Sequence, residues 1–144
     1  MAELTLELAQ KMLADTLSHC RGHKFNPMAV VVLDAAGGIK AAASEDNTTF
    51  LRWRVAHGKA YGAVALGMPS RRLNTMAGER PHFVSALGGL TDGQLIPVPG
   101  GVAIRDHDKR IIGAIGVSGD TSDNDEAAAV AAIKAAGFIA DPGA

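Results

Sequence analysis

The feature that most constrains the fold is a short apolar run, Met28–Asp34, which consists largely of valine and other β-favouring residues. Pro27 precedes the run and two glycines follow it, and this length and composition predict a strand buried on both faces. The turn Ala35–Gly38 leads directly into a second run, Ile39–Ala43. The two strands are therefore predicted to pair as a hairpin.

Three later runs also have the composition of strands: Gln94–Val98, Val102–Asp106 and Ile111–Ser118. The last two are joined by four polar residues at 107–110, which predicts a second hairpin. Residues 70–89, between the two groups of strands, form a polar segment that is interrupted by glycines. There we expect one or two short helical turns and no long element.

Helices are predicted before, between and after the strands, over residues 5–21, 47–66 and 123–138. Thr5 can cap the first helix and Gly22 can end it, whereas Gly67 stops the second. The third is rich in alanine, a strong helix former. Because the strands come as hairpins with helices around them, the order predicts an α+β fold with a mainly antiparallel sheet.

Length and composition predict one domain, residues 1–144. A chain of this size can bury enough surface to fold without a disulfide or a structural metal. Cys20 is the single cysteine. A disulfide framework and a zinc ribbon are therefore excluded.

Charge and hydropathy exclude further classes of protein. The formal charge is −1 with both signs interspersed, which gives no electrostatic footprint for nucleic acid. The apolar stretches are far shorter than the roughly 20 residues that a membrane helix needs, and the first residues do not have the pattern of a signal peptide. We therefore expect a soluble cytoplasmic protein with no nucleic-acid or membrane partner.

Five motifs, taken together and in this order, resemble the GlcG/HbpS family. They are Val31–Gly37, Gly58–Tyr61, Pro99–Ile104, Gly113–Gly119 and Asp125-Glu126. The resemblance implies a profilin-like domain with a five-stranded antiparallel sheet flanked by helices, assembled as a homo-oligomer. Its members include haem-binding sensors, a cobalamin-associated domain that binds haem, and proteins encoded beside catabolic enzymes. Ala103 and Gly62 depart from residues that are frequent in the family, so a ligand contact through a hydroxyl at position 62 is absent here.

Pro99, Gly100 and Gly101 lie between two predicted strands. Glycines let backbone N–H groups approach a ligand closely, so this turn is a candidate seat for an anion or carboxylate. The alternative is a tight turn with no ligand. Arg105 follows on the next strand and would reach an anion seated there.

The predicted second helix carries an apolar and aromatic stripe that includes Trp53, His57 and Tyr61. Such stripes pack in a core or an interface, or they form a stacking wall for a flat ligand. In the second case His57 is a candidate axial ligand to iron or a proton carrier. Lys59 either holds a carboxylate or is solvated.

Asp123 and Glu126 have the spacing of a capping box at the start of the last helix. Glu126 also falls on the face of Val130 and Ile133, and a partly buried carboxylate there can serve as a general base or ligand contact. Both interpretations stay open. No metal site is predicted, because His19 and His23 lie at the end of the first helix and form no larger set.

These residues together predict a small-molecule-binding protein that acts beside a catabolic or cofactor pathway. Its ligand is expected to carry a carboxylate or carbonyl, or to be haem, the one candidate cofactor. The pocket is predicted between the second helix, the glycine turn and the last helix, with Trp53, His57, Lys59, Arg105 and Glu126 in reach. One alternative is an isomerase- or lyase-like enzyme with Glu126 or His57 as the proton carrier. The other is an assembly protein with no ligand.

Overall fold

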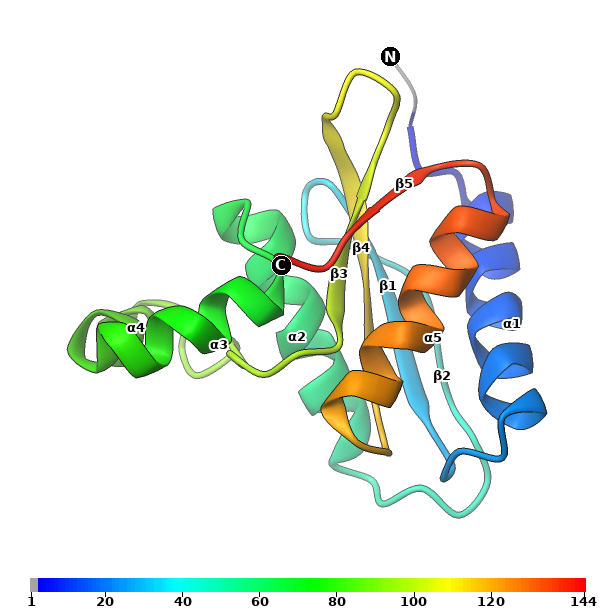
Figure 1. The fold of residues 1–144 in the computed structure, drawn as a ribbon, viewed down its shortest axis with the longest axis horizontal. Coiled ribbons are helices and arrows are strands. Elements are labelled where there is room, and N and C mark those ends of the chain that lie inside the picture. Colours follow the sequence, from blue (N-terminus) through cyan, green and yellow to red (C-terminus); the bar gives the residue numbers. More distant parts are fainter. Residues whose placement is uncertain (1–2) are drawn as a thin grey trace.

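The computed structural model describes residues 3–144 and builds them from five helices and five strands (Figure 1). The helices are α1 Leu6–Gly22, α2 Arg52–Leu66, α3 Ser70–Glu79, α4 Pro81–Leu90 and α5 Ser122–Ala135. The strands are β1 Ala29–Asp34, β2 Ile39–Ser44, β3 Gly101–Arg105, β4 Ile111–Ser118 and β5 Ile139–Asp141. None of the helices in this part of the chain is long and apolar enough to cross a membrane.

The strands form one sheet in the order β2-β1-β4-β3-β5, with every neighbouring pair antiparallel. Both predicted hairpins, β1–β2 and β3–β4, are present, and the predicted α+β class with a five-stranded antiparallel sheet is confirmed. The fifth strand differs from the prediction. Gln94–Val98 forms no strand, because its backbone bonds to α2 through Ile96 N–H and Gly58 O and two prolines lie in or beside it. The short β5 pairs with β3 instead.

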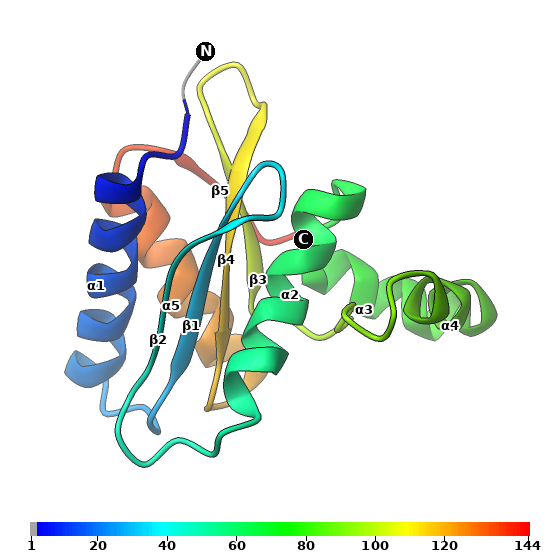
Figure 2. The same cartoon turned by 180° about the vertical axis from the view of Figure 1, so that it is seen from behind.

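Helices cover both faces of the sheet (Figures 1 and 2). On one face α1 and α5 pack side by side over the larger core. Val30, Val32, Ile115 and Ile133 are fully buried there, and each such side chain contributes about 1.5–3 kcal/mol of hydrophobic stabilisation. On the other face α2 packs over β1, β4 and β3.

The packing of α2 on the sheet depends on two glycines. A Cβ at Gly116 of β4 would overlap the carbonyl oxygen of Ala56, and one at Gly101 of β3 would overlap that of Lys59. The alanines on this side of α2 are small as well, so the helix backbone lies directly on the strands. This close approach places the side chains of α2 next to the ends of β3 and β4.

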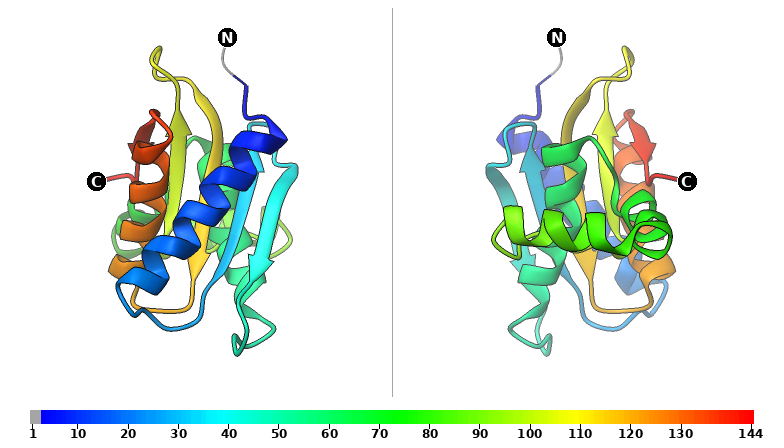
Figure 3. Two further views of the ribbon diagram at one scale, coloured as in Figure 1. Left: turned by 90° about the vertical axis from the view of Figure 1, so that its right-hand side faces the viewer. Right: turned by 90° about the vertical axis from the view of Figure 1, so that its left-hand side faces the viewer.

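The polar segment 70–89 forms two ten-residue helices, α3 and α4, so the prediction of short helical turns was wrong. Pro81 begins α4, where a missing N–H costs nothing. The two helices extend away from the sheet on the α2 side (Figures 1 and 3). A third cluster around Leu73, Leu87 and Leu95 holds them there.

The predicted ends of the other helices hold with three corrections, of which one is that α5 ends at Ala135 and not at residue 138. Thr5 caps α1 by accepting the N–H of Leu8, and Gly67 ends α2 with a φ of 66°. However, α2 begins at Arg52 and not at Asn47, whose φ of 71° turns the chain before the helix starts. The N-cap of α5 is Thr121, whose hydroxyl accepts the N–H of Asn124.

Two β-bulges lie at the same end of the sheet. In the β1–β2 ladder Val32 pairs with Ala41 and Leu33 with Ile39, which leaves Lys40 as the extra residue. In the β3–β4 ladder Ile104 pairs with Gly113 and Arg105 with Ile111, which leaves Ile112 as the extra residue.

Candidate functional site

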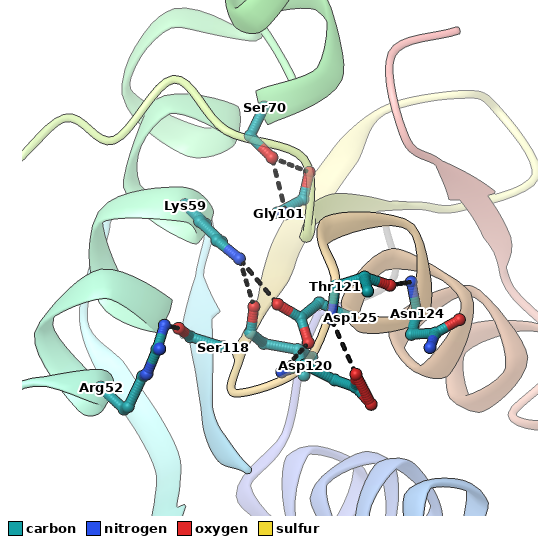
Figure 4. A network of polar contacts seen from close by, with 10 residues as sticks. Arg52, Lys59, Ser70, Gly101, Ser118, Asp120, Thr121, Asn124 and Asp125 are labelled. Atoms are coloured by element: carbon teal, nitrogen blue, oxygen red, sulfur yellow. Dashed lines mark hydrogen bonds and ion pairs between the residues drawn. The ribbon is translucent and has the colours of Figure 1, made fainter. Parts of the chain in front are cut away.

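A buried ion pair joins the two sides of the sheet (Figure 4). The Lys59 ammonium of α2 lies 3.0 Å from a carboxylate oxygen of Asp125 on α5, and the side chains are 3% and 2% exposed. The ammonium also donates to the carbonyl oxygen of Val117 at 2.9 Å. Burial lowers the pKa of Lys59 and raises the pKa of Asp125, and each charge opposes the shift of its partner. Both charged groups thus have hydrogen-bond partners inside the protein.

The second Asp125 oxygen accepts the backbone N–H of Asp120 at 2.9 Å, which folds the turn between β4 and α5. The buried hydroxyl of Ser118 accepts a bond from the Arg52 guanidinium at 3.3 Å. Sequence reasoning missed Asp125, Ser118 and Arg52. The signal for Asp125 was its spacing to Ala128, Ala129 and Ala132, small residues on the buried face of α5.

The glycine turn before β3 packs against the same cluster. Gly100 has a φ of 125°, and a Cβ there would come within 2.9 Å of the Lys59 nitrogen. The N–H of Gly101 donates to the Ser70 hydroxyl at 2.7 Å, while Pro99 and both glycines are buried. The Gly101 donor is therefore already paired inside the protein, and the turn lets Lys59 reach Asp125.

Glu126 does not join this cluster and contacts α3 instead. Its carboxylate accepts from Arg71 Nε at 2.8 Å, and the same guanidinium bonds Asp123 at 2.5 Å. The predicted capping box does not form, because Thr121 begins the helix two residues before Asp123. Glu126 and Asp123 instead bridge α5 to α3.

Arg105 lies at the far end of β3 from the glycine turn, about 13 Å along the strand. Its guanidinium bonds Asp141 of β5 at 2.8 Å and the Lys109 carbonyl oxygen at 2.8 Å. The structure therefore does not bring Arg105 to Lys59. The bond from Arg105 to Asp141 instead stabilises the pairing of β5 with β3.

Trp53 and His57 line a cavity of about 530 Å³ on the outer side of α2. Its wall is completed by the end of β2 and by the chain after α4; the lining residues are Ile39, Leu51, Trp53, Arg54, Val55, His57, Asp92, Gly93, Gln94 and Ile96. Its volume and its apolar wall with a few polar groups are typical of small-molecule sites.

The aromatic and charged groups of this cavity are Trp53, Arg54 and His57 of α2 and Asp92 of the chain after α4. Burial lowers the pKa of His57, so its imidazole is neutral at physiological pH. The indole of Trp53 is 41% exposed, and the Arg54 guanidinium lies 5.5 Å from its ring centroid. The Tyr61 ring lies 5.8 Å from that of His57, but Tyr61 does not line the cavity and packs on the cluster around Leu73 instead. The cavity thus offers an aromatic wall, a cation, a carboxylate and a neutral imidazole nitrogen.

The single pocket that the sequence suggested is divided in the structure. Lys59 follows His57 by two residues and so projects about 200° around the helix, into the buried cluster instead of the cavity. Glu126 and Arg105 lie in ion pairs elsewhere. Over residues 3–144, no three His, Cys, Asp or Glu side chains are grouped to hold a metal ion.

One family model and several solved structures match the chain. No individually curated protein sequence matches the chain. Among solved structures, the crystal structure of a PduOC–haem complex superimposes with a TM-score of 0.84 at 22% identity, covering 95% of this chain and 97% of that one. Protein ORFY of Klebsiella pneumoniae gives 0.84 at 22% identity, covering 95% and 93%.

The crystal structure of HbpS superimposes with a TM-score of 0.81 at 23% identity, covering 94% of this chain and 91% of that one. These likenesses show the fold. The profile of the family described as haem degrading protein HbpS-like matches residues 4–134, which span nearly all of the sheet and helices. The chain therefore belongs to the HbpS-like family.

Proposed function

We propose that this protein binds a small molecule in the cavity beside Trp53 and His57, in the service of a catabolic or cofactor pathway. The observation that carries the proposal is the pairing of a half-exposed indole with a neutral imidazole in a cavity of about 530 Å³. A flat ligand would stack on Trp53, and a carboxylate on it would meet Arg54. Lys59, Gly100 and Gly101 hold α2 in place beneath the cavity and do not contact the ligand.

Haem is the ligand that the family favours, and the residues present fit it. A neutral imidazole is a common axial ligand to haem iron, and His57 supplies one at an apolar wall. Arg54 would pair with a propionate. Bound haem would supply the redox chemistry of its iron, while the chain's part is to hold it and to shield one face. A relative of the same fold was crystallised with haem, which supports this choice.

Haem titration tests the proposal. The wild-type protein should shift the Soret band of added haem with saturation near one equivalent per chain. His57→Ala should weaken binding and change the band position, because it removes the iron ligand. His107→Ala is the matched control, since His107 is exposed on the β3–β4 hairpin away from the cavity. Equal titrations for wild type and His57→Ala would contradict the assignment.

We also propose that the protein forms a homo-oligomer through the rim of this cavity. Four large apolar side chains lie exposed on or near it: Ile39, Phe50, Leu51 and Trp53. Phe50 is 89% exposed, and a cluster of this kind is normally covered by another surface. Light scattering should give a mass above one chain, and Phe50→Asp should lower it. A wild-type monomer of 14.8 kDa at micromolar concentration would contradict this proposal.

The proton-transfer alternative has little support in the geometry. Of its two carriers only His57 lines the cavity, because Glu126 is bound to Arg71 on another surface.

A further inference from the structure

A second cavity, of about 440 Å³, lies at the end of the sheet where both hairpins turn. This end is at the top of Figure 1, where the chain also enters α1. Its lining includes Glu3, Leu4, Asp34, Lys40, Arg110 and Ile112. It shares no residue with the cavity of Trp53 and His57.

Both β-bulges of the sheet contribute to this cavity. Lys40 and Ile112, the extra residues of the two bulged ladders, are both lining residues. Bulges are frequent beside binding and active sites, where they re-aim a side chain out of the regular alternation. Two of them at one end of the sheet give this cavity a shape that a regular hairpin end would not have.

The floor of the cavity is apolar. Leu4 and Ile112 are each 5% exposed, and Ile111 is half-buried beside them. These branched aliphatic side chains come from the segment before α1 and from β4. The floor therefore suits an aliphatic group of modest size.

The rim carries two cations and two acids that do not neutralise one another. Lys40, Arg110, Asp34 and Glu3 form no ion pair with any charged side chain of residues 3–144. Asp34 is held in place, because one of its oxygens accepts the N–H groups of Ala36 and Gly38, each at 2.9 Å. Its other oxygen accepts no bond from the described chain. The rim thus offers one anchored carboxylate, a second carboxylate and two cations, none of them in an ion pair within the described chain.

We propose that this cavity binds a small zwitterion with an aliphatic side chain, that is, an aliphatic α-amino acid. Its carboxylate would meet Arg110 and Lys40, its ammonium would meet Asp34 and Glu3, and its side chain would lie on Leu4 and Ile112. A simple carboxylate would face the two acids unpaired, and a simple amine would face the two cations. The volume lies within the range of about 300–1,000 Å³ that is usual for small-ligand sites.

Calorimetry and ligand-observed NMR with L-leucine test this site. The comparison ligands are 4-methylpentanoate, which lacks the amine, and 3-methylbutylamine, which lacks the carboxylate. We expect L-leucine to bind and both comparison ligands to bind at least about tenfold more weakly, since each loses a charge-assisted contact. Arg110→Gln and Asp34→Asn should each weaken leucine binding to a similar degree.

Lys109→Gln is the matched control, because Lys109 is exposed on the same hairpin but does not line the cavity. It should bind leucine as the wild type does. Three outcomes would overturn the proposal: no binding of leucine at millimolar concentration, equal binding of 4-methylpentanoate, or equal weakening by Lys109→Gln. Circular dichroism of Asp34→Asn verifies the fold, and Arg110→Gln provides the same test without touching the β1–β2 turn.

Discussion

The Lys59 ammonium and the Asp125 carboxylate meet at 3.0 Å with almost no access to solvent, although they come from helices that pack on opposite faces of the sheet. They meet near the C-terminal end of β4, where Lys59 also bonds the Val117 carbonyl. Removing a charge from water is costly, and each buried charge is tolerated here because its partner compensates part of that cost. This contact explains why a lysine and an aspartate are placed in a protein interior built mainly of alanine, valine and isoleucine.

Asp125→Asn should be strongly destabilising. The substitution keeps the shape of the side chain but leaves the Lys59 charge buried without its partner, which costs about 3–5 kcal/mol. Urea denaturation should show this loss in the free energy of unfolding. Asp46→Asn removes a carboxylate from an exposed position and should change the free energy by less than about 0.5 kcal/mol.

The double variant Lys59→Met with Asp125→Asn provides a further check. Removing both charges should cost less than the sum of the two single variants, because no unpaired charge remains buried. Strictly additive losses would contradict the role assigned to the pair.

Gly116→Ala should separate α2 from the sheet. Its Cβ would overlap the carbonyl oxygen of Ala56, and the surrounding contacts are between backbones that cannot move independently. We expect a loss of at least about 1–3 kcal/mol in the free energy of unfolding. Thermal denaturation followed by circular dichroism measures it.

Gly78→Ala is the matched control for this substitution. A Cβ at Gly78 meets nothing within 4 Å, and the residue lies inside α3. Alanine in a helix is favoured over glycine by about 0.5–1 kcal/mol, so this variant should be slightly stabilised. If both variants shifted the melting temperature in the same direction and by the same amount, the close-packing explanation would fail.

The strands were predictable because their signal is local. β4 runs from Ile111 to Ser118, the predicted bounds, since a β-branched run between turn residues specifies a strand without help from distant parts of the chain. The helices α3 and α4 were missed for the opposite reason. Glycines interrupt both segments, Gly78 in α3 and Gly88 and Gly89 in α4. What stabilises these helices is the contact of Leu73 and Leu87 with Leu95. Such a contact has no signature in a short window of sequence.

The candidate site was predictable in part. The motif around Lys59 and the glycine turn does form one cluster, and Trp53 and His57 do share a cavity. At α5 the prediction was wrong about which face of the helix points inward. Choosing Glu126 instead of Asp125 as the inward carboxylate rotates the helix by about 100°, and the correct phase is set by Lys59, which is 66 residues away in the sequence.

Thr121→Ala should destabilise α5 more than Asp123→Ala does. The Thr121 hydroxyl accepts the N–H of Asn124, and loss of an N-cap of this kind costs about 1 kcal/mol. Asp123 is 83% exposed and contributes an ion pair with Arg71, which is expected to be worth about 0.5 kcal/mol or less. Denaturant titration of the two variants ranks them. A larger loss for Asp123→Ala would contradict Thr121 as the N-cap and would favour the capping box that the spacing of Asp123 and Glu126 predicted.

The protonation of His57 should make the stability of the protein depend on pH. Burial places the pKa of His57 below its ordinary value of about 6.5. As the pH falls through that value, the unfolded chain takes up a proton before the folded chain does. The free energy of unfolding therefore decreases between about pH 7 and the lower pKa of the folded state. Above this window both states are neutral at His57, so the residue contributes no pH dependence.

Urea denaturation at constant ionic strength from pH 7.5 to 5 measures this effect, and His57→Asn should flatten part of the slope. His19 contributes in the same direction, because burial and the neighbouring His23 lower its pKa. His19→Asn must therefore be measured beside His57→Asn, and the two reductions in slope should add, since the residues lie in different helices. An unchanged slope in His57→Asn would show that the imidazole is no harder to protonate in the folded protein. It would then also lose its advantage as a ligand, because a proton would compete with iron for the same nitrogen near neutral pH.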